Sequence, residues 1–118
     1  MDITPIVPHN RNLINGYGNG KFLVNNKEYY GSIVIFPENV ITVNEIDINN
    51  PEHFADFLTE EVEVLLIGTG KTRSIPNASV KSYLIKMNFE FMTTDAACRT
   101  HNVLISEDRF VVTYLLAI

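Results

Sequence analysis

Short apolar runs separated by turn-forming residues dominate the first half of the chain. Residues 13–17 and 21–24 flank Gly18-Asn19-Gly20, whose residue types tolerate the positive φ angles of a tight hairpin. Residues 28–36 and 40–43 are rich in β-branched and aromatic residues and flank a proline-containing turn. The first half is therefore predicted to consist of two pairs of strands.

The spacing of apolar positions becomes helical in parts of the second half. Apolar residues that follow Pro51 and Pro76 recur every three or four positions, which predicts helices over about residues 51–58 and 76–87. Thr93 or Thr94 is expected to cap a third helix that ends near Ser106. We therefore expect two to three helices.

Strands are predicted between these helices. Residues 62–67 and 109–118 are almost continuously apolar, which is typical of strands buried on both faces, and residues 89–92 form a shorter run. The central-sheet residues expected to be buried are Val64, Leu66, Val112 and Leu115. Alternating strands and helices indicate an α/β fold, and a right-handed crossover makes residues 62–67 and 89–92 parallel neighbours.

Length and charge exclude several classes of protein. The 118 residues match one domain, predicted over residues 1–118 with residues 1–12 as a loosely ordered arm. Nine basic against fourteen acidic residues give 9 − 14 = −5, without the basic stripe of a DNA-binding protein. The same balance disfavours anionic lipid, and no apolar run is long enough to span a bilayer. We expect neither nucleic acid nor membrane insertion.

The location is predicted from composition. Residues 1–14 lack a basic segment followed by an apolar one, so we expect a cytoplasmic protein. Asparagine and isoleucine, which have AT-rich codons, are abundant and indicate a bacterium. Neither a disulfide, a metal site nor a cofactor is expected from one cysteine and three scattered histidines.

One candidate binding site lies where the predicted parallel strands end. Their carboxyl ends share an edge, which places Gly68, Thr69, Gly70 and Arg73 beside Thr93 and Thr94. Gly68-Thr69-Gly70-Lys71-Thr72 resembles the end of a phosphate-binding loop, but Leu65 stands where that loop needs its first glycine. The remaining interpretations are a glycine-containing turn and a small-anion site in which Arg73 and the helix start supply the donors.

Cys98 is the candidate nucleophile, with Arg99 and His101 close to it in sequence. A catalytic thiol needs a lowered pKa and a base, whereas free cysteines are commonly buried for packing. We therefore favour a structural cysteine and assign no catalytic residue.

The segment from Glu90 to Leu104 carries a specific motif, Met92-Thr93-Thr94-Asp-Ala-Ala-Cys98-Arg99-Thr100-His101-Asn102. With residues 65–70 and 31–33, it resembles the family that includes mitochondrial complex I assembly factor 3, the adipogenesis-associated Mth-type domain proteins and many bacterial proteins of unknown function. The resemblance covers about residues 31–116. Family members commonly have tyrosine in place of His101 and glycine in place of Asp108.

The resemblance implies a three-layer Mth-type α/β fold with a mixed central sheet, to which the first half adds an N-terminal β-hairpin layer. It implies no established enzymatic activity, and the animal relative acts through protein partners. Arg99 and Asn102 carry over as motif residues that either present donors at one patch or fasten the helix to a neighbouring loop.

The leading hypothesis is a non-enzymatic protein-binding or assembly-accessory factor, linked to respiratory complex I assembly. The alternative is a small-molecule binding protein or enzyme that takes a small anion at residues 68–73 and 93–99. Homo-oligomerisation stays open. Arg99→Ala is expected to destabilise the fold more than Arg73→Ala, because an arginine in a packed helix holds neighbouring carbonyls.

Overall fold

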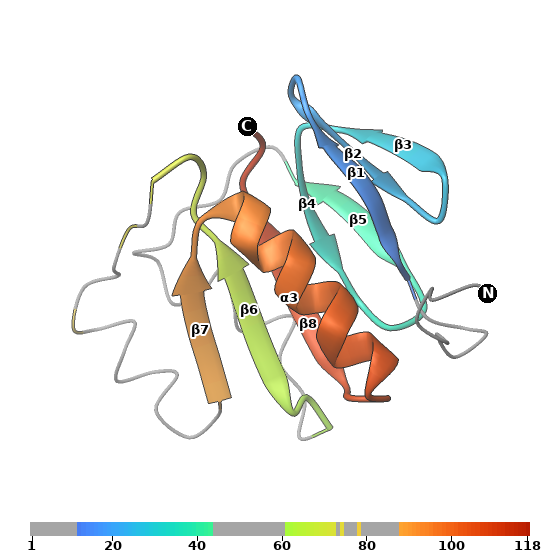
Figure 1. Ribbon diagram of the computed structural model, residues 1–118, viewed down its shortest axis with the longest axis vertical. Helices are drawn as coiled ribbons and strands as arrows, with labels where there is room; N and C mark the ends of the chain where they lie inside the picture. The colour runs from blue at the N-terminus through green and yellow to red at the C-terminus, as the bar shows by residue number, and fades with distance from the viewer. Residues whose placement is uncertain (1–11, 44–60, 73, 75–77, 79–87) are drawn as a thin grey trace, which may run out of the picture.

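The N-terminal part of the chain forms a small antiparallel sheet. The computed structural model describes residues 12–43, 61–72, 74, 78 and 88–118 (Figure 1). Strands β1 (Ile14–Gly18), β2 (Lys21–Val24) and β3 (Lys27–Tyr30) pair in the order β1-β2-β3. The predicted first hairpin is confirmed, since residues 18–20 all have positive φ and Gly18 pairs with Lys21.

The prediction of one strand over residues 28–36 is wrong. β3 ends at Tyr30, and β4 (Ser32–Ile35) belongs to a second sheet. Gly31 lies between them with φ +82°, a conformation that residues with a side chain rarely adopt. This glycine lets the chain leave one sheet and enter the other.

The second sheet has five strands in the order β5-β4-β8-β6-β7. Its other members are β5 (Val40–Val43), β6 (Val64–Gly68), β7 (Asn88–Met92) and β8 (Val111–Leu115). β6 runs parallel to β7 and β8, whereas β4 is antiparallel to β5 and β8. The predicted mixed sheet and the parallel pair are confirmed. β8, the last strand in sequence, lies at the centre.

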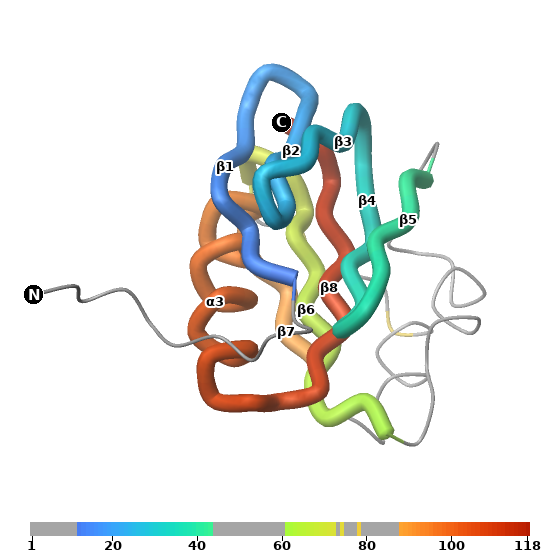
Figure 2. The backbone as a smooth tube through the Cα atoms, turned by 90° about the vertical axis from the view of Figure 1, so that its right-hand side faces the viewer, coloured from blue at the N-terminus to red at the C-terminus, as the bar shows by residue number. Residues whose placement is uncertain are grey.

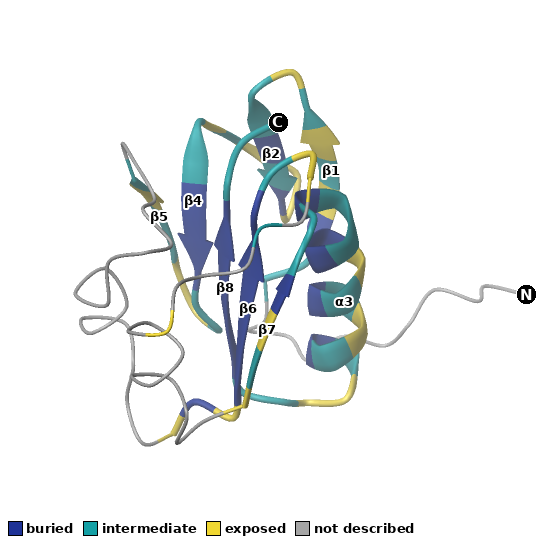
Figure 3. Ribbon diagram, turned by 90° about the vertical axis from the view of Figure 1, so that its left-hand side faces the viewer, coloured by how far each residue is buried: buried dark blue, intermediate teal, exposed yellow. Residues whose placement is uncertain are grey.

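Helix α3 (Thr94–Ser106) and the three-stranded sheet lie on the same side of the five-stranded sheet (Figures 2 and 3). They share a core in which Phe22 and Val24 of β2 meet Ile33 of β4, Ala97 of α3 and Leu115 of β8. The additional N-terminal layer is therefore present. The helices predicted over residues 51–58 and 76–87 lie outside the described residues, except for Ala78, which is helical.

The predicted core positions of the central strands are buried. Val64, Leu66, Val112 and Leu115 expose 7%, 1%, 0% and 0% of their surface. Val64 and Leu66 belong to the cluster beneath Leu104 of α3, whereas Val112 packs on the opposite face of the sheet. Continuous apolar sequence thus reports burial on both faces, as expected for central strands.

The end of α3 explains one departure from the family pattern. Asp108 follows the helix with φ +58°, the left-handed conformation that glycine adopts most easily. A glycine common at this position in the family is consistent with that backbone conformation. Aspartate tolerates it better than most residues.

Truncation of Leu66 tests the position of β6. Leu66→Ala is expected to lower the free energy of unfolding by about 2–5 kcal/mol, because a buried side chain is lost and a cavity remains. Val103→Ala, at a helix position that is 57% exposed, serves as the control and should change stability by less than about 0.5 kcal/mol. Chemical denaturation measures both. A loss below about 1 kcal/mol for Leu66→Ala would contradict this placement.

Candidate functional site

The predicted edge site is present as a junction between the end of β6 and the start of α3. The Thr94 amide donates to the Gly70 carbonyl at 2.9 Å, and the Gly70 amide donates to Thr94 Oγ1 at 2.9 Å. The Thr69 amide donates to the Met92 carbonyl at 2.8 Å. The structure therefore brings residues 68–70 beside Thr93 and Thr94, whereas Arg73 lies outside the described residues.

The polar groups of this junction bond to one another. Thr94 Oγ1 also donates to the Leu116 carbonyl at 2.8 Å, and Thr69 Oγ1 accepts from the Ser74 amide at 3.0 Å. A Cβ on Gly68 would lie 2.9 Å from Leu115 Cδ2 and 3.0 Å from Thr94 Cα. Gly68 thus serves close packing of β6 against α3 and β8. The arrangement favours the interpretation as a turn over the interpretation as an anion site.

The helix begins where predicted, with Thr93 at the N-cap position, but neither threonine side chain makes a capping hydrogen bond. The Thr93 hydroxyl donates to Asp95 Oδ1 at 2.5 Å, which is the main reason why the pKa of Asp95 is lowered; a hydrogen bond from the Ala96 amide adds to it. The acidic side chain in the first turn therefore takes the role expected of the threonines.

Asn102 fastens α3 to the three-stranded sheet. Its Oδ1 accepts from the Ile14 amide at 2.9 Å, and its Nδ2 donates to the Ile14 carbonyl at 2.8 Å. The side-chain amide thereby pairs with both backbone groups of one residue, as a neighbouring strand would. Of the two roles open to this motif residue, the structure shows the fastening one.

Arg99 holds no backbone carbonyl of the described residues, contrary to the prediction. Its side chain is 66% exposed and forms an i,i+4 ion pair with Asp95 at 3.6 Å. Together with Asn102 and Cys98 it lines a small cavity of about 140 Å³ between α3 and β1. Burial, assisted by the charge of Asp95, raises the pKa of the Cys98 thiol to about 12, so the thiol stays protonated. The expectation of a buried structural cysteine is confirmed.

His101 has a structural role that the sequence interpretation missed. Its Nε2 lies 2.8 Å from the Asn12 carbonyl, and its Nδ1 lies 2.7 Å from Thr113 Oγ1. A carbonyl only accepts, so Nε2 carries the hydrogen and Nδ1 of the neutral ring accepts from the threonine hydroxyl. Burial lowers the pKa of His101 to about 4. A sequence signal for the burial of His101 was present, because it lies at helical spacing from Thr94, Ala97 and Ile105, which are also buried.

A larger groove runs between α3 and β7 on the same side of the five-stranded sheet. Its volume is about 410 Å³, and it is lined by Val64, Leu66, Asn88, Phe89, Glu90, Thr100 and Leu104. Val64 and Leu66 form its apolar floor, because they pair in register with Asn88 and Glu90 of the adjacent strand. We call this feature the α3–β7 groove.

The rim of the α3–β7 groove is polar. Asn88 and Glu90 are exposed, and Thr100 is half-buried. A site with an apolar floor and a few converging polar groups is the usual form of a binding site. The sequence signal was the alternation of Asn88 and Glu90 along one strand, combined with the i,i+4 pair of Thr100 and Leu104 on the helix.

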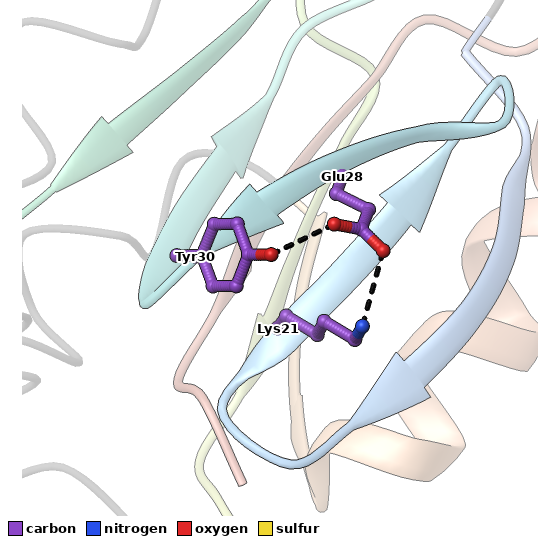
Figure 4. A network of polar contacts seen from close by, with 3 residues as sticks. All are labelled: Lys21, Glu28 and Tyr30. Carbon is purple, nitrogen blue, oxygen red and sulfur yellow. Dashed lines mark hydrogen bonds and ion pairs between the residues drawn. The ribbon is translucent and has the colours of Figure 1, made fainter.

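The outer face of the three-stranded sheet carries a second polar group of residues. Tyr30 donates to Glu28 Oε2 at 2.8 Å, and Lys21 Nζ lies 3.1 Å from Glu28 Oε1 (Figure 4). The hydrogen bond from Tyr30, followed by the one from Lys21, lowers the pKa of Glu28. These three side chains satisfy one another on an exposed face.

Metal-ligand clusters and membrane-spanning helices can be assessed for the described residues. Within those ranges, no three His, Cys, Asp or Glu side chains come together as metal ligands. None of the helices described there is both long and apolar enough to cross a membrane. His9 and His53 lie outside them.

The mixed five-stranded sheet, covered on one side by α3 and by a three-stranded sheet, defines an Mth938-like domain. A solution structure of such a domain from Bordetella pertussis is 26% identical, with a TM-score of 0.76, covering 98% of this chain and 92% of that one. Residues 14–116 match the family "Protein of unknown function (DUF498/DUF598)", and the chain belongs to this family. The predicted relationship to assembly factor 3 and the Mth-type proteins is confirmed.

Two relatives and one further solved structure have names that describe a role or a location. The chain is 33% identical over 115 residues to "NADH dehydrogenase [ubiquinone] 1 alpha subcomplex assembly factor 3" of Drosophila melanogaster; the match covers 88% of this chain and 58% of that protein. It is 29% identical to a "13 kDa major membrane protein" of Francisella tularensis, covering 80% and 82%. A crystal structure described as an outer membrane protein from Bartonella henselae is 33% identical, with a TM-score of 0.82, covering 95% and 98%.

Substitution of the two motif residues separates their roles. Asn102→Ala is expected to lower the free energy of unfolding by about 1–3 kcal/mol, because both backbone groups of Ile14 lose their partner. Arg99→Ala is expected to leave stability close to that of the wild type, because its ion pair is exposed. Urea denaturation of the two variants side by side checks this order. Equal losses of stability in the two variants would contradict the fastening role of Asn102.

His101 makes stability depend on pH. Its pKa is about 4 when folded and about 6.5 when unfolded, so the unfolded chain binds the extra proton between these values. The contribution is complete above pH 6.5 and is lost as the pH falls toward 4. Lowering the pH from about 6.5 to 5 should cost about 1.5 kcal/mol, because the slope approaches about 1.36 kcal/mol per pH unit only below the unfolded pKa. His101→Gln should lack this loss in denaturation series at both pH values; a slope that persists in the variant would contradict the assignment.

Proposed function

We propose that the protein is a non-enzymatic, protein-binding factor of the assembly-accessory type, whose α3–β7 groove receives a segment of its partner. The groove is the observation that carries the proposal. It combines an apolar floor of Val64, Leu66 and Leu104 with a polar rim, which is the composition of a protein contact surface.

The state of the reactive side chains supports binding over catalysis. The Cys98 thiol is kept protonated, and both ring nitrogens of His101 are engaged in the interior. A nucleophile needs a lowered pKa, and a general base needs to reach its substrate. Neither side chain meets its condition, so packing accounts for both.

The name of the Drosophila relative indicates where to look for a partner. That protein is named as an assembly factor of NADH dehydrogenase, and we propose that the present chain also assists the assembly of respiratory complex I. The match covers 58% of the Drosophila protein, so the rest of that protein has no counterpart in this comparison. The net charge of −5 favours a protein partner over anionic lipid.

The alternative of an anion site at residues 68–73 and 93–99 has weaker support. The amides of Thr69, Gly70 and Thr94 already donate to protein oxygens, and an anion would need such donors. Arg99 is engaged with Asp95. The α3–β7 groove, by contrast, has open volume beside its polar groups.

Filling the groove tests the proposed function. Thr100→Trp places an indole over Val64 and Leu66 and is expected to weaken partner capture by at least about tenfold, as loss of an interface anchor does. The control is Ser106→Trp, at the last residue of α3 and outside the groove lining. Capture is carried out from cytosolic and membrane fractions, with subunits of complex I as the probes.

The result is interpretable only if both variants fold, so thermal unfolding is recorded for each. Loss of the same partner by Thr100→Trp and its retention by Ser106→Trp would support the groove as the contact site. Retention by both folded variants would overturn it. Loss of capture with Arg99→Ala instead would favour a contact at the small cavity between α3 and β1.

A further inference from the structure

Asn12 joins three separate parts of the structure. Its Nδ2 donates to the Phe36 carbonyl at 2.7 Å and to the Asn39 carbonyl at 3.3 Å, both in the turn between β4 and β5. Its Oδ1 accepts from Nδ2 of Asn25, which lies in the turn between β2 and β3, at 2.9 Å. Its backbone carbonyl accepts from His101 on α3. Displacement of Asn12 therefore breaks contacts to both sheets and to the helix at once.

The backbone that follows Asn12 is attached to the same turn between β2 and β3. The Leu13 amide donates to Asn25 Oδ1 at 2.9 Å, and the Asn25 amide donates to the Leu13 carbonyl at 2.8 Å. The two residues thus exchange hydrogen bonds, much as a pair in an antiparallel ladder does. Their amides report whether this attachment is intact.

The two bonds of His101 require a neutral ring. Nε2 donates to the Asn12 carbonyl at 2.8 Å, and Nδ1 accepts from the Thr113 hydroxyl at 2.7 Å. Thr113 is fully buried in β8, and among the described residues its hydroxyl has no other partner. A proton on Nδ1 would turn this atom into a donor, deprive the threonine hydrogen of its acceptor and bury a positive charge. The charge is accommodated when the segment at Asn12 moves away and admits water.

The response of His101 to acid is set by the access of water rather than by a neighbouring charge. Burial is the main cause that lowers its pKa from 6.5 to about 4, and the hydrogen bond to Asn12 acts in the opposite direction. On α3 itself, Asp95 and Arg99 pair with each other at exposed positions. The titratable side chains packed in the adjoining parts of the core are a thiol and two phenols, groups that are neutral in acid: Cys98 of α3, Tyr29 of β3 and Tyr114 of β8.

We propose that His101 is an acid-operated latch, whose neutral ring holds Asn12 and the two turns bonded to it and whose protonated ring releases them while β6 and β8 stay paired. In the released state the ring is in water and has its ordinary pKa of 6.5. The released state therefore binds a proton that the closed state excludes. Release becomes easier as the pH falls below 6.5, and the effect is complete below pH 4.

Hydrogen exchange of the Leu13 and Asn25 amides in the full chain measures this release. Between pH 7 and 5 their protection, corrected for the pH dependence of intrinsic exchange, is expected to fall about twentyfold, as follows from pKa values of about 4 and 6.5. The amides of β6 are the internal reference. They should stay better protected than Leu13 and Asn25 at both pH values, because release leaves that strand paired.

Two variants separate the latch from the contacts that it controls. His101→Gln removes the titrating ring, so protection of the two amides should change by less than about twofold between the same pH values. Asn12→Ala keeps the carbonyl that His101 contacts and loses the side-chain bonds to both turns. It should lower protection at both pH values and keep the ratio of about twentyfold between them.

Unchanged protection of Leu13 and Asn25 between pH 7 and 5 in the wild type would overturn the proposal, as would an equal fall in the folded His101→Gln variant. Equal protection of these amides and those of β6 would also overturn it, because the attachment would then open only when the whole chain unfolds. If His101→Gln does not fold, the wild type and Asn12→Ala decide the question through the size of the pH ratio.

Discussion

The position of β8 between β4 and β6 is the constraint on which the rest of the structure depends. All five residues of β8 are buried, and the strand pairs antiparallel on one side and parallel on the other. A strand in this position has to be apolar on both faces, and it aligns the start of α3 with the end of β6. The junction, the helix orientation and the α3–β7 groove all follow from this alignment.

Most of the strand framework could be predicted because each strand has a local signal. The Gly18-Asn19-Gly20 hairpin, the apolar runs of β6 and β8 and the bounds of α3 are encoded in neighbouring residues. The break at Gly31 was missed, because the residues on both sides have the same β-prone composition. The central place of β8 was missed because strand order depends on contacts between distant segments, which local patterns do not report.

The candidate site illustrates the same limit. Motif residues drew attention to the junction, and the structure does bring residues 68–70 beside Thr93 and Thr94. Their hydrogen bonds, however, are used within the fold, and Asn102 serves as a fastener. The polar rim of the groove is formed by Asn88 and Glu90, which lie outside the motif, and by the motif residue Thr100, and their proximity depends on the packing of α3 against β7. Of the motif residues, Thr94, His101 and Asn102 are used by hydrogen bonds within the fold, whereas Arg99 is exposed and Thr100 lines the groove.

The attachment of the three-stranded sheet has a consequence for local opening. Its strands pair with one another, while its links to α3 include the side-chain amide of Asn102 and an apolar contact layer. No strand ladder among the described residues joins the two sheets, so this layer is able to separate as one cooperative unit while β6 and β8 stay paired. Amide hydrogens of β2 would then exchange with solvent through a partial opening that costs less free energy than global unfolding. Such an opening would also expose Cys98, which makes its thiol a reporter of the event.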